Sequence, residues 1–456
     1  MEEMKKSTYP QALKSYNDMQ EPNESFTIHS GEFTLQGECN KSSIVIKVDG
    51  SITYKWIPRK GVVFEGTVLT FDGDRNGTLL TKFDVQINNS NIGVAHICSQ
   101  TFGSDSDFVI SGIIQGVVVG DKAVPVTSVA FSVPNFDKFL GSPVEYERDG
   151  TIWNEKNRLQ LEDDNYIIII DLKPNHKELL LSLEETGGYV FLCDGLITKK
   201  SQESISYEEI CSHEGVLGAL AYFLTFLNGQ RTSPCILHGI HDGEIKWTDY
   251  TNHMIMPNSS RSFRWRPHFW IDGFSNLWRN FFALWKRDLD FLEFAIHWLT
   301  ESLYGEIYVE SRLVSIQNAL ELIFNWYIVE KMNVIIGRDS ENISAANKIR
   351  ILISRLNIDN KVPASLKSLT TLVAENKDIT DGPEAIVLIR NAIVHGNEAK
   401  RKRLKAIDAM AKLDAIMLGT EYVVLSLLRI LEYEHQYVCA CDLKTKPLPW
   451  NNQCKN

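Results

Sequence analysis

The sequence lacks the segments that would send a chain to a membrane or across one. Its first six residues, Met-Glu-Glu-Met-Lys-Lys, contain no apolar core of the secretory kind, and no apolar run reaches the length of a membrane helix. The short run Tyr166–Ile170 is typical of a buried strand. We therefore expect a cytoplasmic protein that contacts no membrane.

Cysteine is sparse, with 8 residues in 456, and scattered apart from Cys439 and Cys441. This usage fits reduced thiols better than a disulfide framework. The Cys-x-Cys pair has no second ligand pair close by in the sequence. Cys235, His238 and His241 have a tempting spacing for a metal, but a strand would turn His238 to the opposite face. The sequence therefore predicts neither a metal site nor a cofactor.

Sequence motifs of several common enzyme classes are also missing. There is no Walker-type loop, no Gly-x-Gly-x-x-Gly before a helix and no Gly-x-Ser-x-Gly elbow, so nucleotide hydrolysis and serine hydrolase chemistry lack support. The net charge of −11 argues against a surface that coats nucleic acid. Residues 301–437 are nearly neutral, with 17 Lys+Arg against 18 Asp+Glu. Any phosphate site must therefore be local.

The first half of the chain has the pattern of an antiparallel β protein. After a polar, extended or frayed lead-in (1–20), residues 21–205 contain short β-branched or alternating runs separated by turn residues. The clearest expected strands are 26–28, 43–47, 62–68, 83–87, 108–114 and 126–131. Many short strands at this spacing predict a β-sandwich or a partly closed barrel.

The period changes after residue 205. Residues 206–300 form a mixed, aromatic-rich connecting region, with a helix expected at 207–227. The segment 261–298 holds five of the ten Trp, interleaved with Arg and Lys, and we favour packing between domains over base stacking. Residues 301–437 predict a bundle of helices, and 438–456 a loose tail. The fold class expected is α+β multidomain, with an antiparallel β-rich N-terminal domain and an all-α C-terminal bundle.

One motif in the helical part carries chemistry. Arg390, Asn391 and His395 come at the end of the expected helix 384–395. Arginine is a permanent cation whose guanidinium binds one phosphate through two N–H groups, and histidine can transfer a proton near neutral pH. The pair could therefore cut a phosphodiester without a metal. On an ideal helix Arg390 and His395 lie about 140° apart. Either the helix breaks near Gly396, or a second chain completes the site.

A structural interpretation of the same residues stays open. Cations near a helix C-terminus offset the macrodipole, and such a pair also occurs by chance. A basic run follows the motif, and it is either a solvated helix face or a surface that holds an RNA backbone. Its members are Lys400, Arg401, Lys402, Arg403 and Lys405.

The motif resembles the Arg-polar-x-x-x-His signature of the HEPN superfamily (higher eukaryote and prokaryote nucleotide-binding). Residues 309–321, ending Gln-x-Ala-Leu-Glu, resemble the early helix of ApeA-type HEPN domains, and residues 224–230 resemble the helix that links an ApeA-like N-terminal domain to it. The resemblance implies a metal-independent endoribonuclease in prokaryotic anti-phage defence of the abortive-infection type. It would act as a homodimer or a higher homo-oligomer. The N-terminal strands resemble ApeA-like domains only loosely.

The resemblance also implies roles for individual residues. His395 acts as general base on the ribose 2′-OH or as general acid on the leaving 5′-oxygen, and Arg390 stabilises charge in the transition state. Asn391 orients the phosphate or the histidine, and Glu321 either holds Arg390 or is an ordinary surface glutamate. The substrate would be RNA, with tRNA as one candidate. The β-rich domain would sense a phage-derived trigger or restrain the nuclease. The alternative is a non-catalytic HEPN-like module that dimerises or binds RNA or nucleotide.

Overall fold

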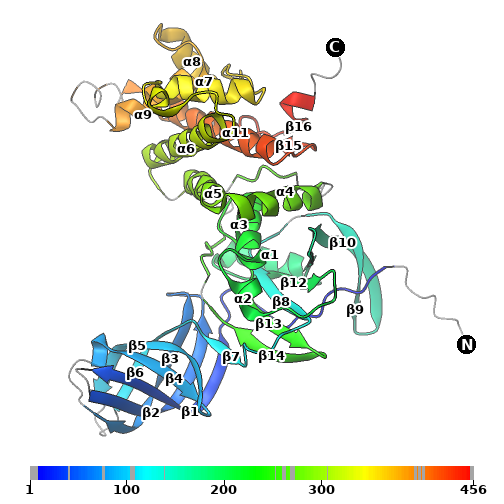
Figure 1. Cartoon of the computed structure of the whole chain (residues 1–456), viewed down its shortest axis with the longest axis vertical. Helices are drawn as coiled ribbons and strands as arrows, with labels where there is room; N and C mark the ends of the chain where they lie inside the picture. Colours follow the sequence, from blue (N-terminus) through cyan, green and yellow to red (C-terminus); the bar gives the residue numbers. More distant parts are fainter. Residues whose placement is uncertain are drawn as a thin grey trace, which may run out of the picture.

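A computed structural model describes residues 9–39, 42–73, 78–102, 108–137, 139–251, 253–258, 263–267, 273–305, 307–394, 398, 402 and 406–451. A β-barrel lies at one end of the molecule, a large sheet in the middle and a helical region at the other end (Figure 1). The fold is therefore α+β and multidomain, with an antiparallel β-rich part before a helical part, as the sequence predicts.

The barrel is closed and has the strand order β1-β2-β3-β6-β5-β4. Every neighbouring pair is antiparallel, and β1 closes the barrel by pairing with β4 through Thr34 to Gly37. Gly50 and Gly66 face each other across β2 and β3, where a Cβ on Gly50 would lie 2.1 Å from the carbonyl oxygen of Glu65. The strands are β1 (Phe26–Cys39), β2 (Ser42–Lys55), β3 (Gly61–Asp72), β4 (Lys82–Ile87), β5 (Ser90–Phe102) and β6 (Phe108–Gln115), with the turn η1 (Thr78–Leu80) before β4.

An eight-stranded sheet follows, in the order β7-β14-β13-β8-β12-β11-β10-β9. Its central strands β8 and β12 are buried along most of their length, as their apolar sequences require. The sheet runs past the expected boundary at residue 205, because β13 pairs with β8 and brings β14 with it. The strands are β7 (Val118–Gly120), β8 (Ser128–Pro134), β9 (Ser142–Arg148), β10 (Thr151–Glu162), β11 (Tyr166–Leu172), β12 (Phe191–Lys199), β13 (Cys235–His241) and β14 (Glu244–Asp249). Helix α1 (His176–Thr186) connects β11 to β12.

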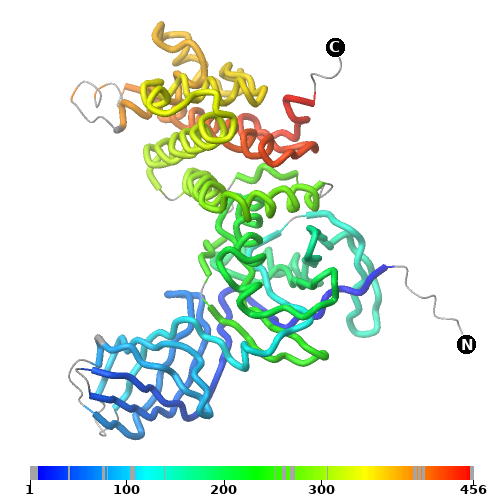
Figure 2. The backbone as a smooth tube through the Cα atoms, in the orientation of Figure 1, coloured from blue at the N-terminus to red at the C-terminus, as the bar shows by residue number. Residues whose placement is uncertain are grey.

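Residues 9–20 are held against this sheet, so of the two expected alternatives, an extended or a frayed lead-in, the frayed one is wrong for them. The backbone NH of Ala12 donates to the carbonyl oxygen of Glu145 on β9 at 2.8 Å, and the buried Lys173 amine donates to the carbonyl oxygen of Asn17 at 3.0 Å. The segment crosses the sheet before it enters the barrel (Figure 2). The hydrophilic side chains of this segment serve as partners for buried polar groups of the sheet.

The helix expected at 207–227 is broken in two. Helix α2 (Tyr207–Cys211) ends before a turn at 212–215, and α3 (Val216–Asn228) ends at Gly229, whose φ of 69° is left-handed as the sequence predicts. By length and composition the stretch Tyr207–Asn228 is apolar enough to cross a membrane. Ten side chains of α3 are buried within the protein, which is the packing of a core helix.

The aromatic-rich segment packs the sheet against the helices. Trp265, Trp278 and Trp285 are all fully buried, so their faces are closed to nucleic-acid bases. Nε1 of Trp278 donates to Oδ2 of Asp163, in the turn between β10 and β11, at 3.1 Å. Trp278 and Trp285 lie on α4 (Phe274–Arg287), which leads into α5 (Leu289–Leu303). The packing interpretation therefore holds for these three residues.

The helical region contains α6 (Val309–Phe324), the π-helical turn η2 (Asn325–Lys331), η3 (Gly337–Ser340), α7 (Ala345–Arg355), α8 (Lys367–Glu375), α9 (Gly382–Val394) and α11 (Ala409–Ile430). The last helix was expected from residue 399, but Ile407 and Asp408 are non-helical and α11 begins after them. The tail is not loose as far as residue 451. It forms the hairpin β15 (Tyr437–Val438) and β16 (Thr445–Lys446), and Leu448 and Trp450 are buried.

Candidate functional site

Helix α9 presents the Arg-Asn part of the predicted motif. Pro383 lies in its first turn, and Oδ1 of Asp381 accepts a hydrogen bond from the backbone NH of Glu384 at 3.0 Å, which caps the helix. Ile386 and Ile389 are buried on the core side. The helix is described as far as Val394, so Arg390 and Asn391 lie in its last described turns.

Arg390 is half-buried, and its guanidinium has an unused donor. Nη1 donates to Oδ1 of Asn391 at 3.3 Å, while Nε is buried and has no hydrogen-bond partner among the described residues. A buried donor without a partner carries a free-energy cost that an anion could relieve. Arg390 and Asn391 therefore form a polar pair in which the buried Nε of the guanidinium stays unpaired among the described residues.

His395 lies outside the described residues, as do Lys400, Arg401, Arg403 and Lys405. Lys402 is described: its amine lies 2.8 Å from Oε1 of Glu398, and both side chains are exposed. An exposed pair of this kind contributes little to stability.

Glu321 on α6 has a local partner. Its Oε1 accepts a hydrogen bond from Nε2 of Gln317, one turn earlier, at 2.7 Å. Helices α6 and α9 pack against each other, yet within the described parts of the chain Glu321 makes no ion pair with Arg390. Gln317 is thus the residue that orients this carboxylate.

An arginine that the sequence analysis missed fixes the start of α9. Arg350 on α7 binds Asp381 through two nitrogens, one of them 3.0 Å from Oδ1, and its Nη2 lies 2.7 Å from Oε2 of Glu384. The hydrogen bonds to Asp381 raise the pKa of Arg350. The Asp-Gly-Pro-Glu helix start was visible in the sequence, but its cationic partner comes from 31 residues upstream.

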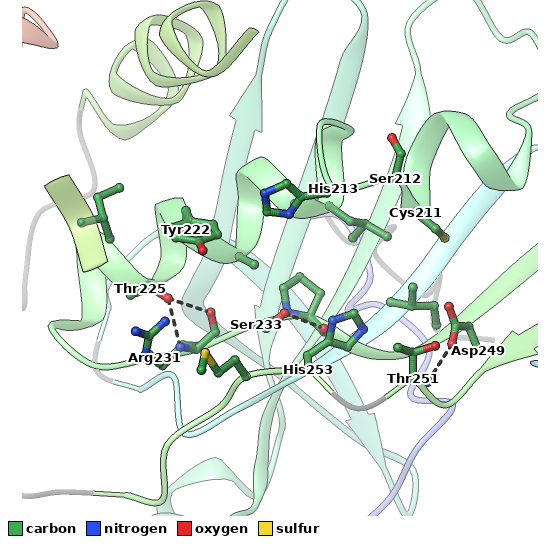
Figure 3. A pocket seen from close by; sticks show the side chains of 18 of the residues that line it. Cys211, Ser212, His213, Tyr222, Thr225, Arg231, Ser233, Asp249, Thr251 and His253 are labelled. Atoms are coloured by element: carbon green, nitrogen blue, oxygen red, sulfur yellow. Dashed lines mark hydrogen bonds between the residues drawn. The ribbon is translucent and has the colours of Figure 1, made fainter. Parts of the chain in front are cut away.

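A cavity of about 390 Å³ opens between the sheet and the connecting helices. It is lined from α2, α3, the 231–234 segment, β13, β14 and α5. Figure 3 shows His213 and Tyr222 on one side of it, across from Arg231, Ser233 and His253. The cavity joins elements of the sheet to helices that lead into the C-terminal region.

Most polar groups around this cavity are already paired. Arg231 donates to Nδ1 of His297 at 2.6 Å and lies 3.1 Å from Oε1 of Glu301. Oδ2 of Asp249 accepts from the Tyr207 hydroxyl at 2.8 Å. Nε2 of His253 is buried and has no partner within the described part of the chain, and burial lowers its pKa. The cavity therefore has a mixed polar and apolar wall, in which the charged groups Arg231 and Asp249 are paired and His253 keeps an unpaired ring nitrogen, and such a wall suits binding of a small ligand.

The spaced residues Cys235, His238 and His241 are not a ligand cluster. His238 is buried, with Nδ1 2.9 Å from the Thr248 hydroxyl and Nε2 3.0 Å from Oδ1 of Asn17. His241 lies near Asp242 at the end of β13. Both ring nitrogens of His238 are therefore engaged by protein groups.

Cys439 and Cys441 do have a third potential ligand, which the sequence analysis missed. Glu421 on α11 brings its carboxylate to them, so that the three ligand atoms all lie within 4.8 Å of one another. All three residues are buried. The contact depends on the tail folding back over α11, and no local sequence pattern predicts that fold. The seven described cysteines are all free thiols.

Fold and site together define an α+β protein in which a β-barrel and an open sheet precede a helical region that carries an Arg-Asn pair. Residues 121–261 match the family model of the YopA central domain, and residues 286–447 match that of the YopA C-terminal domain. The chain is also similar to the SPbeta prophage-derived uncharacterized protein YopA of Bacillus subtilis strain 168. The identity is 25% over 432 residues, covering 91% of this chain and 92% of the relative. No solved structure matches the chain significantly.

The two matched segments follow the architecture. The central-domain match covers the sheet from β8 to β14, and the C-terminal match runs from the end of α4 to β16. The C-terminal match includes Arg390, Glu421, Cys439 and Cys441. The β-barrel lies outside both matches.

Proposed function

We propose that this protein is a cytoplasmic, metal-independent endoribonuclease of the HEPN type, in which the helical region cuts RNA and the N-terminal region controls it. The observation that carries the proposal is the Arg390-Asn391 pair near the end of α9. Arg390 stands five residues, and Asn391 four residues, before His395 in the sequence. Arg390 keeps a buried Nε donor without a partner among the described residues. Arginine at a fixed helix position is suited to a phosphate oxyanion.

The chemistry follows from these side chains. The ribose 2′-oxygen attacks the neighbouring phosphorus as its proton leaves to a base, and the bond from phosphorus to the 5′-oxygen breaks as that oxygen takes up a proton from an acid. Arg390 stabilises the added negative charge on the phosphorane-like transition state. The products are a 2′,3′-cyclic phosphate and a 5′-OH, with no electrons transferred and no metal required.

A homodimer suits this reaction. The step needs one base and one acid, and a single motif offers one histidine. Two copies of His395 at a shared interface would supply both, and Arg390 of each copy would face the same phosphate. Light scattering at micromolar concentration should find the dimer, and a monomer with full activity would contradict this part of the proposal.

Control by the N-terminal region is supported by the 390 Å³ cavity at the junction of sheet and helices. A ligand there would contact β13, α3 and α5 together, and so would favour one arrangement of the junction over another. Ala221 lines the cavity, and Ala221→Phe would fill part of it. RNA cleavage should change in this variant although His395 is not altered. If cleavage and the response to infection both stayed the same, the cavity would have no part in control.

The YopA relative is prophage-derived, and a prophage protein can act against infection by other phages. This supports the proposal that the protein is an abortive-infection effector. Expression of the wild type should then be toxic to the cell, and His395→Ala should remove the toxicity while the protein stays folded. Equal toxicity of the variant would argue against His395 as the proton-transfer group.

The decisive experiment incubates the purified full chain with total RNA and with tRNA in EDTA, followed by analysis of fragment ends. Wild type should give 2′,3′-cyclic phosphate ends, while Arg390→Ala and His395→Ala should give none. Arg338→Ala, at an exposed position in η3, and His29→Ala, in the barrel, are the matched controls and should cleave normally. RNA binding by wild type and variants alike, without cleavage by any, would instead favour the non-catalytic binding module.

A further inference from the structure

The C-terminal tail and α11 build a buried pocket of sulfur and oxygen ligands. Glu421 is 7% exposed, and Cys439 and Cys441 are each 4% exposed. The hairpin of β15 and β16 turns the Cys-x-Cys segment back onto α11, where Glu421 is one of the few charged side chains among apolar neighbours. Burying a carboxylate beside two thiols is costly unless the group has strong partners.

The partners of Glu421 fix its position and leave room for another one. Oε1 accepts from the Tyr437 hydroxyl at 2.5 Å, and Oε2 accepts from the backbone NH of Ala440 at 2.7 Å. A carboxylate has about four lone-pair sites, so each oxygen can accept again. Both donors therefore hold the Glu421 carboxylate in place while its oxygens stay able to bind a metal. Outer-shell hydrogen bonds orient metal ligands in this way.

Charge at the sulfur atoms is compensated from the hairpin. The Lys446 amine lies 3.4 Å from Sγ of Cys439 and 2.7 Å from Oδ2 of Asp442. Two thiolates, Glu421 and Asp442 together carry four negative charges, of which a divalent cation and Lys446 would offset three. A cationic donor such as Lys446 stabilises the thiolate form of the cysteine, which is the form that binds a metal.

The donor set selects the kind of metal. Thiolate favours zinc and other thiophilic ions over magnesium or calcium, which prefer oxygen. With zinc bonds of about 2.3 Å to sulfur and about 2.0 Å to oxygen, tetrahedral ligand atoms are separated by about 3.3 to 3.8 Å. The three atoms here all lie within 4.8 Å of one another, so a closure of at most about 1 Å or slightly more would bring them to these separations.

We propose that Glu421, Cys439 and Cys441 bind a zinc ion that fastens the C-terminal tail to α11. The site does not depend on the ribonuclease proposal, since it uses none of the residues named there. Its consequence is structural: the ion ties the segment carrying Leu448 and Trp450 to the core of the helical region. The competing interpretation is a hydrogen-bonded polar cluster that holds the tail without a metal.

The first test measures metal bound to the full-length protein purified under reducing conditions without chelator. Elemental analysis should find close to one zinc ion per chain in the wild type, and Cys439→Ser and Cys441→Ser should each lose it. Cys98→Ser, at an exposed cysteine in the barrel, is the matched control and should keep the ion. Glu421→Gln should weaken zinc binding by about tenfold or more. Equal zinc in wild type and both tail variants would overturn the proposal.

A second test keeps the wild-type chain, in case the serine variants fold poorly. Cobalt titrated into chelator-stripped protein should give a thiolate-to-cobalt charge-transfer band that zinc removes. Zinc should also slow alkylation of Cys439 and Cys441 relative to the chelator-stripped protein, while the exposed Cys98 reacts equally in both, as read by mass spectrometry. No such band, together with alkylation of Cys439 and Cys441 that zinc leaves unchanged, would establish the metal-free cluster instead.

Discussion

The side chains of His238 and Asn17 meet across 221 positions of the chain, with Nε2 of the histidine 3.0 Å from Oδ1 of the asparagine. Nδ2 of Asn17 donates to the Ser132 hydroxyl at 3.1 Å, which turns its Oδ1 toward the ring. His238 must then donate from Nε2 and accept at Nδ1 from Thr248, so the neutral ring satisfies every partner. This contact fastens the N-terminal segment to the sheet.

Asn17→Ala should therefore destabilise the sheet region. The variant leaves a buried histidine NH without an acceptor, at a cost of about 1 to 3 kcal/mol. Because a chain of several domains need not unfold in one step, the readout is amide hydrogen exchange of β13 and proteolysis near residue 17. Asn342→Ala, at an exposed site in the helical region, should change neither. Undisturbed exchange at β13 in Asn17→Ala would contradict the anchoring role.

Acid should weaken the same region through His238. Burial lowers the pKa of His238 to about 4, below the value of about 6.5 expected when the chain is unfolded. Between these values the unfolded state binds more protons, so the free energy of unfolding falls as the pH drops, by up to about 3 kcal/mol near pH 4. In His238→Gln the dependence on pH over this window should be flatter, although the variant starts less stable. Denaturant midpoints at several pH values measure it, and parallel curves for both proteins would refute the assignment.

Arg350→Ala should loosen the start of α9. The substitution removes the two guanidinium nitrogens that bind the buried Asp381 and costs about 2 to 3 kcal/mol. Arg350→Lys should restore only part of the loss, because lysine lacks the planar fork. Hydrogen exchange of α7 and α9 is the measurement, with the exposed Arg338→Ala as control. If Arg350 also positions Arg390, RNA cleavage should fall along with the protection of α9.

Trp278→Ala should separate the sheet from the helices more than any surface substitution. Trp278 is fully buried and stacks on Phe282 with ring centroids 5.2 Å apart, and its indole NH reaches Asp163. Truncating a buried tryptophan costs about 3 to 5 kcal/mol. Trp153→Ala, at a half-buried ring on β10, should cost less. Limited proteolysis between β14 and α4 would detect the opening, and equal resistance of both variants would count against the packing role.

Local structure was largely predictable from local sequence. The β-branched runs before residue 131 gave strands, and Asn228-Gly229 ended a helix, because a left-handed residue is needed there and glycine adopts it without strain. Pro383 marked the start of α9 for a similar backbone reason. Element ends without such residues were predicted less well, as at α11.

The sequence by itself determined the α+β class, the order of strands before helices and the Arg390-Asn391 pair near a helix end, since each depends on periodicity or on neighbours in the chain. Only the tertiary structure decided that β1 closes a barrel on β4, that Asn17 meets His238, and that Glu421 meets Cys439 and Cys441. These contacts join residues that the sequence separates by 18 to 221 positions. Their partners are selected by how whole elements pack, and no local pattern of side chains carries that information.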